Sequence, residues 1–545
     1  MFKTKAGQRV LYSNANKKAT TQTIKKIAVI GGGWSGLYAL KILREDGHQA
    51  VLFEASDSIG GIWKYQENQP GGVWQSTYTN SSKTYLHASD YPLPEALPLF
   101  PHHSDILKYL HNYATHFHLW NHIYCQHNII NLKKSGKIWF VSIEQNSVVT
   151  NYEFDAVVIC TGQSRVPVVP SDHMFTHFCG ITMHSHEYKY PTEQMKGKSI
   201  LIIGGGESAC EIANEVSSTA ECVYLSMRKG RWFQPKHNGP HLALDTRNPR
   251  KARMIMKNKF LHSYAVKVYE MLSIASFGVG GHGIDKWAPK VPMLSGIVNK
   301  SREVVDKITI GKVIPQQGVI DIKGHSIWFE NEAQPTHIDM IIYATGYRPE
   351  FSFLDNYNST QLYKLVFDIE DSTLCFIGMV RPLFGSIPAL AELQARWVSA
   401  VFKGTVKLPS REKMQKCIQQ DAIYQQQKFP VDYKRVPYLV DHFEYADYIT
   451  RQLNAQPNFW WLFFVNNKKW RILMNAPWTP FEVLLNDPEK QGQAYKNIVK
   501  EYRLKKETNH FSLSKALFAS GVGIAMAMTL LFQLSIKTIS WLLKE

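Results

Sequence analysis

Two glycine-rich turns stand 173 residues apart in this 545-residue chain. The first follows the apolar run 27–30 and reads Gly31-Gly32-Gly33-Trp34-Ser35-Gly36. The second follows the apolar run 199–203 and reads Gly204-Gly205-Gly206-Glu207-Ser208-Ala209. A strand, a glycine turn and a helix bring bare backbone amides and a helix N-terminus against a pyrophosphate. The sequence therefore predicts two dinucleotide sites.

The residues beyond each turn distinguish the two cofactors. A second apolar run ends at Glu54, and a carboxylate about 20 residues beyond the turn accepts hydrogen bonds from a ribose with both hydroxyls free. The first copy therefore indicates FAD. The equivalent position in the second copy is 227, beside Arg228 and Lys229. Positive charge there suits the 2′-phosphate of NADP, so the second copy predicts NADPH.

Each copy is closed by a later apolar strand. One leads from Asp155 to Thr161-Gly162 and the other from Asp339 to Thr345-Gly346, with the same spacing from Asp to Thr. The predicted fold class is α/β, with two Rossmann-like domains, the NADP domain inserted in the FAD domain, and a C-terminal hydrophobic helix. The expected parts are an N-terminal arm (1–26), an FAD domain (27–165 and 336–405), an NADP domain (166–335) with an inserted segment at about 251–300, and a C-terminal region of unknown role (406–511).

Charge and cysteine content exclude other classes. The formal net charge is +17, but the basic residues are scattered and no nucleic-acid-binding motif accompanies them, so we expect no nucleic-acid partner. An anionic dinucleotide and an anionic membrane surface explain the charge better. The seven cysteines contain no CxxC pair and no metal-ligand spacing. This pattern argues against a dithiol flavin reductase, fits reduced thiols in the cytosol and predicts no metal.

An uncharged run, residues 516–536, lies between Lys515 and Lys537. A run of this length can cross ~30 Å of hydrocarbon. We therefore expect a transmembrane helix that anchors the chain. A packed or surface helix is the alternative, which Ser520, Gly521 and Gln533 keep open.

Between the two turns, the segment from Phe178 to Tyr188 fits the pattern FxGxxxHxxxY. Three further motifs flank this segment. Gly60-Gly61-Ile62-Trp63 and Thr79-Asn80 come before it, and Ala344-Thr345-Gly346-Tyr347 comes after it. With these motifs the chain resembles the flavin-containing monooxygenases from about residue 25 to 405, and its later segments look like the animal-type, dimethylaniline monooxygenase-like members. The resemblance implies the fold and cofactors that the glycine turns predict.

The resemblance also implies a reaction. NADPH reduces FAD, O2 adds to the flavin, and a C4a-hydroperoxyflavin oxygenates a soft nitrogen or sulfur nucleophile of small size. Asn80 matches the asparagine that lies beside flavin and nicotinamide in this family, so it is the expected catalytic residue. Its amide is a donor that brings no proton-labile charge. In a eukaryote the family implies the endoplasmic reticulum membrane with the catalytic part in the cytosol; a homo-oligomer stays open.

The expected site residues come from these motifs. Trp63 is expected at the flavin edge, and Trp397 either in the wall of the substrate cavity or in the core. His184 and Tyr188 are expected to be structural, while His87 and Asp90 match the family more loosely. The expected cofactor-binding residues are Gly31, Gly33, Ser35, Gly36, Glu54, Gly61, Ile62, Trp63, Thr79, Asn80, Ser81, Gly204, Gly206, Ser208, Ala209, Arg228, Lys229, Thr345 and Gly346.

Three other functions stay open. Ketone oxygenation of the Baeyer-Villiger type ranks below nitrogen and sulfur oxygenation. The chain departs from that subgroup's pattern, because Tyr188 stands where the subgroup has Trp and is followed by Lys189 instead of Pro or Asp. An uncoupled NADPH oxidase is the second alternative. A membrane-anchored nucleotide-binding protein without turnover is the third, and steady NADPH-dependent oxygen consumption would distinguish it from the enzymes.

Overall fold

The computed structural model describes residues 24–237, 242–247, 249–251, 254, 266–267, 270–271, 285–289, 291–355, 357 and 361–508. Most of the expected arm, most of segment 251–300 and the apolar run 516–536 lie outside these residues. No helix within the described ranges is long and apolar enough to cross a bilayer.

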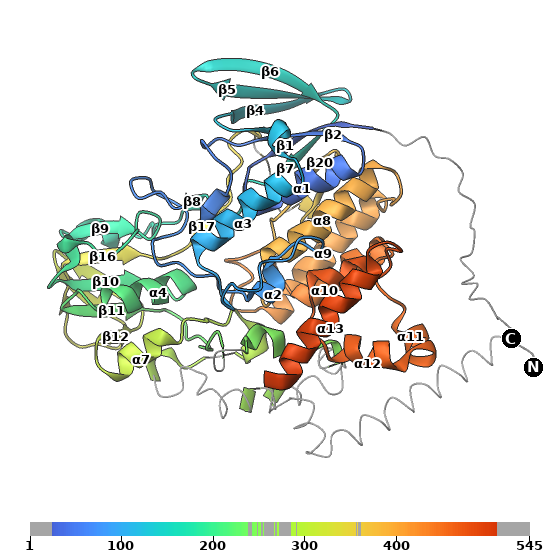
Figure 1. Cartoon of the computed structure of the whole chain (residues 1–545). Helices are drawn as coiled ribbons and strands as arrows, with labels where there is room; N and C mark the ends of the chain where they lie inside the picture. The colour runs from blue at the N-terminus through green and yellow to red at the C-terminus, as the bar shows by residue number, and fades with distance from the viewer. Residues whose placement is uncertain are drawn as a thin grey trace, which may run out of the picture.

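A seven-stranded sheet lies at the centre of the larger part of the molecule (Figure 1). Its inner strands are parallel and buried on both faces, because helices cover them. Helix α1 (Trp34–Glu45) packs against α8 (Ile387–Phe402) on one face. The strand order is β18 (Leu362–Tyr363), β19 (Phe367–Asp368), β20 (Leu374–Phe376), β7 (Ala156–Ile159), β1 (Lys26–Ile30), β2 (Gln49–Phe53) and β3 (Ile123–Tyr124).

A second, parallel five-stranded sheet forms the smaller part, at the left of Figure 1. Helix α4 (Glu207–Val216) follows its central strand, and α7 (Glu303–Thr309) packs beside α4. The strand order is β12 (Val313–Gln316), β11 (Cys222–Ser226), β10 (Ser199–Ile203), β16 (Met340–Tyr343) and β9 (Ile181–His184).

The limits of the second part differ from the expected division in one place. Strand β16 pairs with β10 in the second sheet, whereas the sequence division assigned residues 336–405 to the first domain. The strand stays with the second sheet because it supplies the parallel neighbour that β10 needs on its other side. The chain leaves the first part at β8 (Val166–Pro167) and returns at β17 (Tyr347–Arg348), and these two strands pair antiparallel. The second limit therefore lies near residue 346.

Smaller elements surround the two sheets. An antiparallel sheet at the top of Figure 1 contains β4 (Asn128–Ser135), β5 (Ile138–Gln145) and β6 (Val148–Phe154). Another contains β13 (Val319–Lys323), β14 (Ser326–Phe329) and β15 (Thr336–His337), and a short pair joins β21 (Arg381–Pro382) to β22 (Leu439–Val440). Two helices of the first part are α2 (Lys83–Leu86) and α3 (His103–His116).

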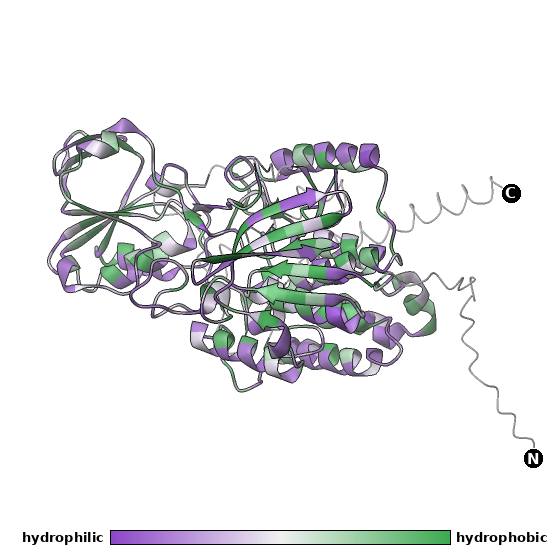
Figure 2. Cartoon of the chain, turned by 90° about the horizontal axis from the view of Figure 1, so that it is seen from above, coloured by the Kyte–Doolittle hydropathy of each residue, from purple (hydrophilic) through white to green (hydrophobic). Residues whose placement is uncertain are grey.

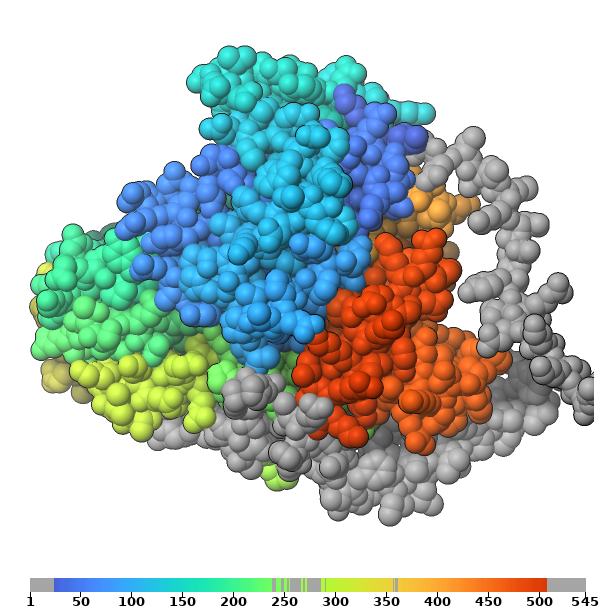
Figure 3. Space-filling view, viewed as in Figure 1, coloured from blue at the N-terminus to red at the C-terminus, as the bar shows by residue number. Residues whose placement is uncertain are grey.

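The C-terminal region folds onto the first sheet instead of standing apart. Its buried residues Met414, Phe443, Trp478 and Ile498 share one hydrophobic core with Ile27 of β1. In Figure 2 the outer helices carry both hydrophilic and hydrophobic residues, as expected for helices that bury one face. In Figure 3 the N-terminal part, in blue, lies between the second part in green and these helices in red. They are α9 (Arg411–Lys428), α10 (His442–Gln452), α11 (Phe459–Val465), α12 (Asn467–Asn475) and α13 (Gln491–Thr508).

Candidate active site

The first glycine turn joins β1 to α1 with little space. Gly31 has φ +106°, and a Cβ there would lie 2.7 Å from the carbonyl oxygen of Cys160. A Cβ at Gly36 would overlap the carbonyl oxygen of Gly31. A Cβ at Gly33, the N-cap of α1, would meet only Gly61 Cα, at 3.6 Å, among the described residues. The turn is therefore closed towards the protein and open at the helix N-terminus, where an anion binds.

Glu54 lies at the end of β2 and faces this turn. Its Oε2 accepts a hydrogen bond from the backbone N–H of Gly32 at 2.5 Å. Its Oε1 accepts hydrogen bonds from the N–H and hydroxyl of Ser56, at 2.8 and 2.9 Å. The carboxylate is thus fixed where the ribose of a dinucleotide lies in this fold, with acceptor capacity left on Oε2.

The second glycine turn repeats this geometry with different side chains. Gly204 has φ +148°, and a Cβ there would overlap the carbonyl oxygen of Ala344. A Cβ at Gly205 would lie 2.8 Å from Met227 Sδ, as a Cβ at Gly32 would lie 3.0 Å from Glu54 Oε2. Met227 therefore occupies the place of Glu54. The next two side chains, Arg228 and Lys229, are exposed.

Helix α4 begins at this second turn, with Gly206 as its N-cap. No described atom comes within 4 Å of a Cβ at Gly206, so its surroundings are open. Ser208 is half-buried in the first turn of α4. Ala209 is fully buried, and its Cβ would lie 3.4 Å from a Cβ at Gly204. The second turn thus holds a methyl group at position 209, whereas a methyl group at the equivalent Gly36 would overlap the carbonyl oxygen of Gly31.

The closing strands end beside the two turns. Gly162 and Gly346 both have positive φ, +78° and +96°, which turns the chain sharply after β7 and β16. The hydroxyl of Thr345 donates a hydrogen bond to the carbonyl oxygen of Val168. The equivalent hydroxyl of Thr161 is buried and has no hydrogen-bond partner within the described part of the chain.

The segment Gly61–Trp63 sits directly on the first turn. Gly61 has φ +54°, and a Cβ there would lie 3.0 Å from Gly33 Cα. The Trp63 ring is 5.9 Å from the Trp34 ring. Ile62 exposes 51% of its surface. The structure thus brings these predicted residues to the N-terminus of α1.

Ser35 lies on the other side of α1, against residues that the sequence motifs did not include. A Cβ at Gly378 would overlap the Ser35 hydroxyl, so position 378 needs a glycine. The amide of Gln163 donates to the carbonyl oxygen of Gly378 at 2.8 Å, and Gln394 accepts from the Gly378 N–H at 2.8 Å. Position 163 follows Thr161-Gly162 directly, which is the one sequence signal that points to it.

The loop 79–82 carries polar atoms that lack partners. Thr79 is 1% exposed, and its hydroxyl oxygen and Asn80 Oδ1 are buried without a hydrogen-bond partner among the described residues. The Ser81 hydroxyl donates to the carbonyl oxygen of Gly385 at 2.5 Å. Buried polar atoms are nearly always paired. Unpaired ones in a single loop therefore fit a bound polar ligand.

Two residues that the sequence did not single out hold this loop. The Lys300 ammonium donates to the carbonyl oxygen of Asn80 at 2.8 Å. The backbone N–H of Ser82 donates to Asp245 Oδ2 at 2.7 Å. Burial lowers the pKa of Lys300, with Asp245 and Glu207 opposing. Burial raises the pKa of Asp245, with Lys300 opposing.

The motif from 178 to 188 supports the second part structurally. A Cβ at Gly180 would overlap the carbonyl oxygen of Asp339, so a glycine lets β9 approach β16. His184 is the last residue of β9 and is buried. The Tyr188 hydroxyl donates to Glu215 of α4 at 2.8 Å. Burial, followed by Glu215, raises the pKa of Tyr188.

Three further candidates belong to the core of the first part. Trp397 is 1% exposed and packs 4.9 Å from the Phe367 ring, so the structure places it in the core. The His87 ring lies 4.4 Å from the Phe481 ring. Asp90 pairs with Lys41 at 2.5 Å; burial raises the pKa of Asp90, but Lys41 and Arg396 outweigh it and lower the pKa.

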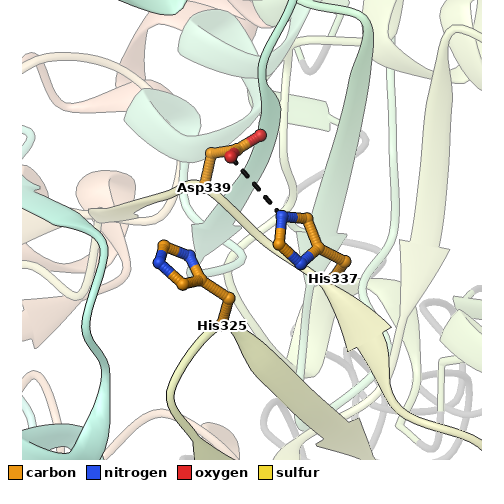
Figure 4. A group of neighbouring side chains, drawn as sticks. All are labelled: His325, His337 and Asp339. Carbon is orange, nitrogen blue, oxygen red and sulfur yellow. Dashed lines mark ion pairs between the residues drawn. The ribbon is translucent and has the colours of Figure 1, made fainter.

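A histidine group lies apart from the glycine turns. The ligand atoms of His325, His337 and Asp339 lie within 4.8 Å of one another, close enough for one metal ion (Figure 4). His325 Nδ1 lies 2.8 Å from the carbonyl oxygen of Ile338, and Asp339 accepts the Ser199 N–H at 2.9 Å. The Lys198 ammonium, 3.9 Å from Asp339, competes with a cation. Cysteine spacing could not reveal a group of this kind, because it consists of two histidines and an aspartate.

Sequence comparison assigns the chain to a family. The profile of flavin-binding monooxygenase-like proteins matches residues 24–540. The chain belongs to this family. Flavin-containing monooxygenase 5 of Rattus norvegicus is 34% identical to it over 499 residues, or 87% of this chain and 91% of the relative. Flavin-containing monooxygenase 2 of Homo sapiens is 31% identical to it over 533 residues, which cover 91% of this chain and 97% of the relative.

Solved structures share the fold of this flavin-binding monooxygenase. S-allyl-L-cysteine S-oxygenase from Allium sativum superposes with a TM-score of 0.60 at 21% identity, over 88% of this chain and 99% of that one. The open crystal structure of cyclohexanone monooxygenase superposes with a TM-score of 0.58 at 14% identity, over 79% of this chain and 98% of that one. At these identities the likeness concerns the fold. The predicted family and enzyme class are confirmed, as is the mixed α/β fold.

Proposed function

We propose that this flavin-binding monooxygenase holds FAD at the first turn and NADPH at the second, and oxygenates soft nitrogen or sulfur nucleophiles. The reaction consumes NADPH, a proton and O2. It yields NADP+, water and a substrate that carries the second oxygen atom as an N-oxide, hydroxylamine or S-oxide. The bound flavin supplies the redox chemistry.

The loop 79–82 is the observation that carries this proposal. It offers an unpaired, buried Asn80 Oδ1 and is tied through Lys300 to the N-terminal end of α4. This loop lies beside the helix that follows the second glycine turn, and some of its buried polar atoms have no hydrogen-bond partner among the described residues. Both features fit a bound dinucleotide. Glu54 would accept the FAD ribose hydroxyls, and Arg228 would pair with the 2′-phosphate.

Names of relatives favour nitrogen and sulfur as the oxygenated atoms. One relative, from Pan troglodytes, is dimethylaniline monooxygenase [N-oxide-forming] 2, at 31% identity over 91% of this chain. The Allium sativum S-oxygenase supports the same direction with a likeness of fold. Ketone oxygenation is the second candidate, because cyclohexanone monooxygenase shares the fold.

A substrate panel tests the proposal. Purified protein with FAD, NADPH and O2 is given a tertiary amine, a thioether or a ketone. We expect N-oxide and S-oxide in amounts that match the NADPH consumed. An ester from the ketone alone would instead establish the second candidate. NADPH consumption that yields only hydrogen peroxide would indicate an oxidase, and no consumption would indicate a binding protein.

Asn80 tests the site itself. Asn80→Asp should keep FAD and accept hydride, because the loop backbone is held by Lys300 and Asp245. A carboxylate adds negative charge and loses the donor of the amide. We expect product per NADPH to fall and hydrogen peroxide to rise. Wild-type coupling in this variant would remove Asn80 from the active site.

We also propose that residues 516–536 anchor the chain in a membrane, in a eukaryote that of the endoplasmic reticulum. The support is their uncharged length in the sequence. The full chain should stay in the membrane pellet after a carbonate wash, and a chain that ends at Thr508 should not. A full chain that is soluble without detergent would overturn the proposal.

A further inference from the structure

Residues Asn299, Lys300 and Ser301 connect the second glycine turn to the loop 79–82. We call this tripeptide the 299–301 bridge. On one side, the Asn299 amide lies 3.5 Å from the carbonyl oxygen of Gly205 and 3.0 Å from Cys210 Sγ. Its Oδ1 accepts the Ser301 N–H at 2.8 Å, which closes the turn of the bridge. Asn299 and Ser301 are each 1% exposed.

Glu207 fixes the bridge with both carboxylate oxygens. The backbone N–H of Lys300 donates to Oε1 and the Ser301 hydroxyl donates to Oε2, each at 2.9 Å. Glu207 is the first residue of α4, directly after the Gly206 N-cap. Any ligand that orders this helix N-terminus therefore also orders the backbone of Lys300.

The other side of the bridge is the Lys300 side chain. Its ammonium donates a hydrogen bond to the carbonyl oxygen of Asn80. Asp245 accepts a hydrogen bond from the backbone N–H of Ser82, so the loop backbone is held at both residues. The loop backbone is gripped while Asn80 Oδ1 stays unpaired among the described residues. The bridge thus fixes the backbone that carries the Asn80 side chain and makes no hydrogen bond to Asn80 Oδ1.

We infer that Lys300 is a positioning residue that couples dinucleotide binding at the second turn to the placement of Asn80. Its ammonium contacts the backbone of the loop, at the carbonyl oxygen of Asn80. The inference rests on the proposed function, because it assumes that the second turn binds NADP and that Asn80 serves the oxygenation. It adds a path between them: Gly206 and Glu207, then Lys300, then Asn80.

Amide hydrogen exchange on the FAD-loaded protein tests the path without turnover. In the wild type, NADP+ should slow exchange both in α4 and in peptides that cover residues 79–86. In Lys300→Met, NADP+ should still slow exchange in α4, but the response of 79–86 should fall at least threefold. Lys300→Arg, which keeps a cationic donor, should recover part of it.

Lys198→Met is the matched control. Lys198 also belongs to the second part, but among the described residues its ammonium pairs with Asp339, 3.9 Å away, and not with Glu207, the bridge or the loop 79–82. This variant should respond like the wild type. In turnover, Lys300→Met should lower product per NADPH about twofold or more while KM for NADPH changes less than threefold.

Several outcomes overturn the inference. One is a wild-type exchange response in Lys300→Met, and another is an equal loss in Lys198→Met, which would indicate general loosening. If Lys300→Met loses its flavin, Glu207→Gln provides the second test, because it weakens the hold on the bridge and keeps the ammonium; an unchanged 79–86 response there overturns the inference. Failure of the proposed function is distinct: the wild type would make no oxygenated product, whatever its exchange response.

Discussion

The two glycine turns share one backbone path and differ in the side chains placed against it. Glu54 faces the middle glycine of the first turn, and Met227 faces that of the second. The helices differ in the same way. Trp34, Tyr38 and Ile42 form one buried row of α1, and the equivalent positions of α4 are Glu207, Glu211 and Glu215.

This difference shows how a repeated fold acquires two roles. The row of α1 packs into the core of the first part. The row of α4 instead makes polar contacts with other segments, since Glu207 holds the 299–301 bridge and Glu215 accepts from Tyr188. The shared backbone turn suits a dinucleotide, and the side chains around it determine which dinucleotide binds and which other segments the helix contacts.

The largest effect should come from the spacing between helix and strand. Gly36→Ala forces a methyl group into the carbonyl oxygen of Gly31, whereas Ala209→Gly in the second turn removes one. Overpacking of this kind costs about 1–3 kcal/mol or more, and Ala209→Gly costs about 1 kcal/mol. We expect Gly36→Ala to purify without flavin absorbance and Ala209→Gly to bind NADPH. Yellow, stable Gly36→Ala protein would contradict the close approach.

A reciprocal exchange of the facing residues should have the next largest effect. Glu54→Met removes charge-assisted hydrogen bonds worth about 1.5–3 kcal/mol, so FAD affinity should fall roughly 10- to 100-fold. Met227→Glu places a carboxylate beside the 2′-phosphate, so KM for NADPH should rise at least tenfold and that for NADH much less. Met227→Leu is the control for size. Flavin titration and steady-state kinetics measure both, and an equal loss for NADPH and NADH would refute the role of position 227.

Arg228→Ala should have a smaller, selective effect. Loss of a guanidinium partner for the 2′-phosphate should raise KM for NADPH about tenfold and leave NADH nearly unchanged. Lys229→Ala, the neighbouring exposed cation, serves as the comparison. If Lys229→Ala shows the larger change, the phosphate contact belongs to Lys229.

The smallest effect on cofactor binding should come from the carboxylate row of α4, which acts on stability. Burial raises the pKa of Glu211 to about 7, with Lys236 opposing. Because the folded pKa exceeds the unfolded one, Glu211 destabilises the fold increasingly as pH rises from about 4.5 to about 7, by at most ~1.4 kcal/mol per pH unit. Glu211→Gln should remove this slope. Denaturant unfolding at pH 5 and pH 8 measures it, and an unchanged difference between the two pH values would contradict the burial of this charge.

Local backbone constraints explain what the sequence predicted well. The glycine turns, Glu54 and the closing strands follow from positions where a side chain or a reversed φ decides the path. Lys300, Asp245 and Gln163 were missed, because each is a single polar residue that reaches a partner far away in the chain. No spacing marks such residues.

Two other expectations depended on information that spacing does not contain. The limit near 336 was too early, because the assignment of β16 to a sheet depends on pairing with β10 and not on its own residues. Trp397 stayed undecided between cavity wall and core. Its neighbours, such as Phe367, come from strands whose packing the sequence does not reveal.

The core that joins Ile27 to Ile498 has a consequence for biosynthesis. Strand β1 emerges from the ribosome first, yet β20, which pairs with β7, and α8, which packs against α1, follow hundreds of residues later. At a synthesis rate of ~5–20 residues per second, the nascent strand waits roughly 20 to 70 seconds for them. We expect its apolar surface to stay incompletely covered during that time, and flavin to load only after these later segments have folded onto the first part. A chain that stops prematurely near residue 440 would therefore retain both glycine turns and still emerge without flavin.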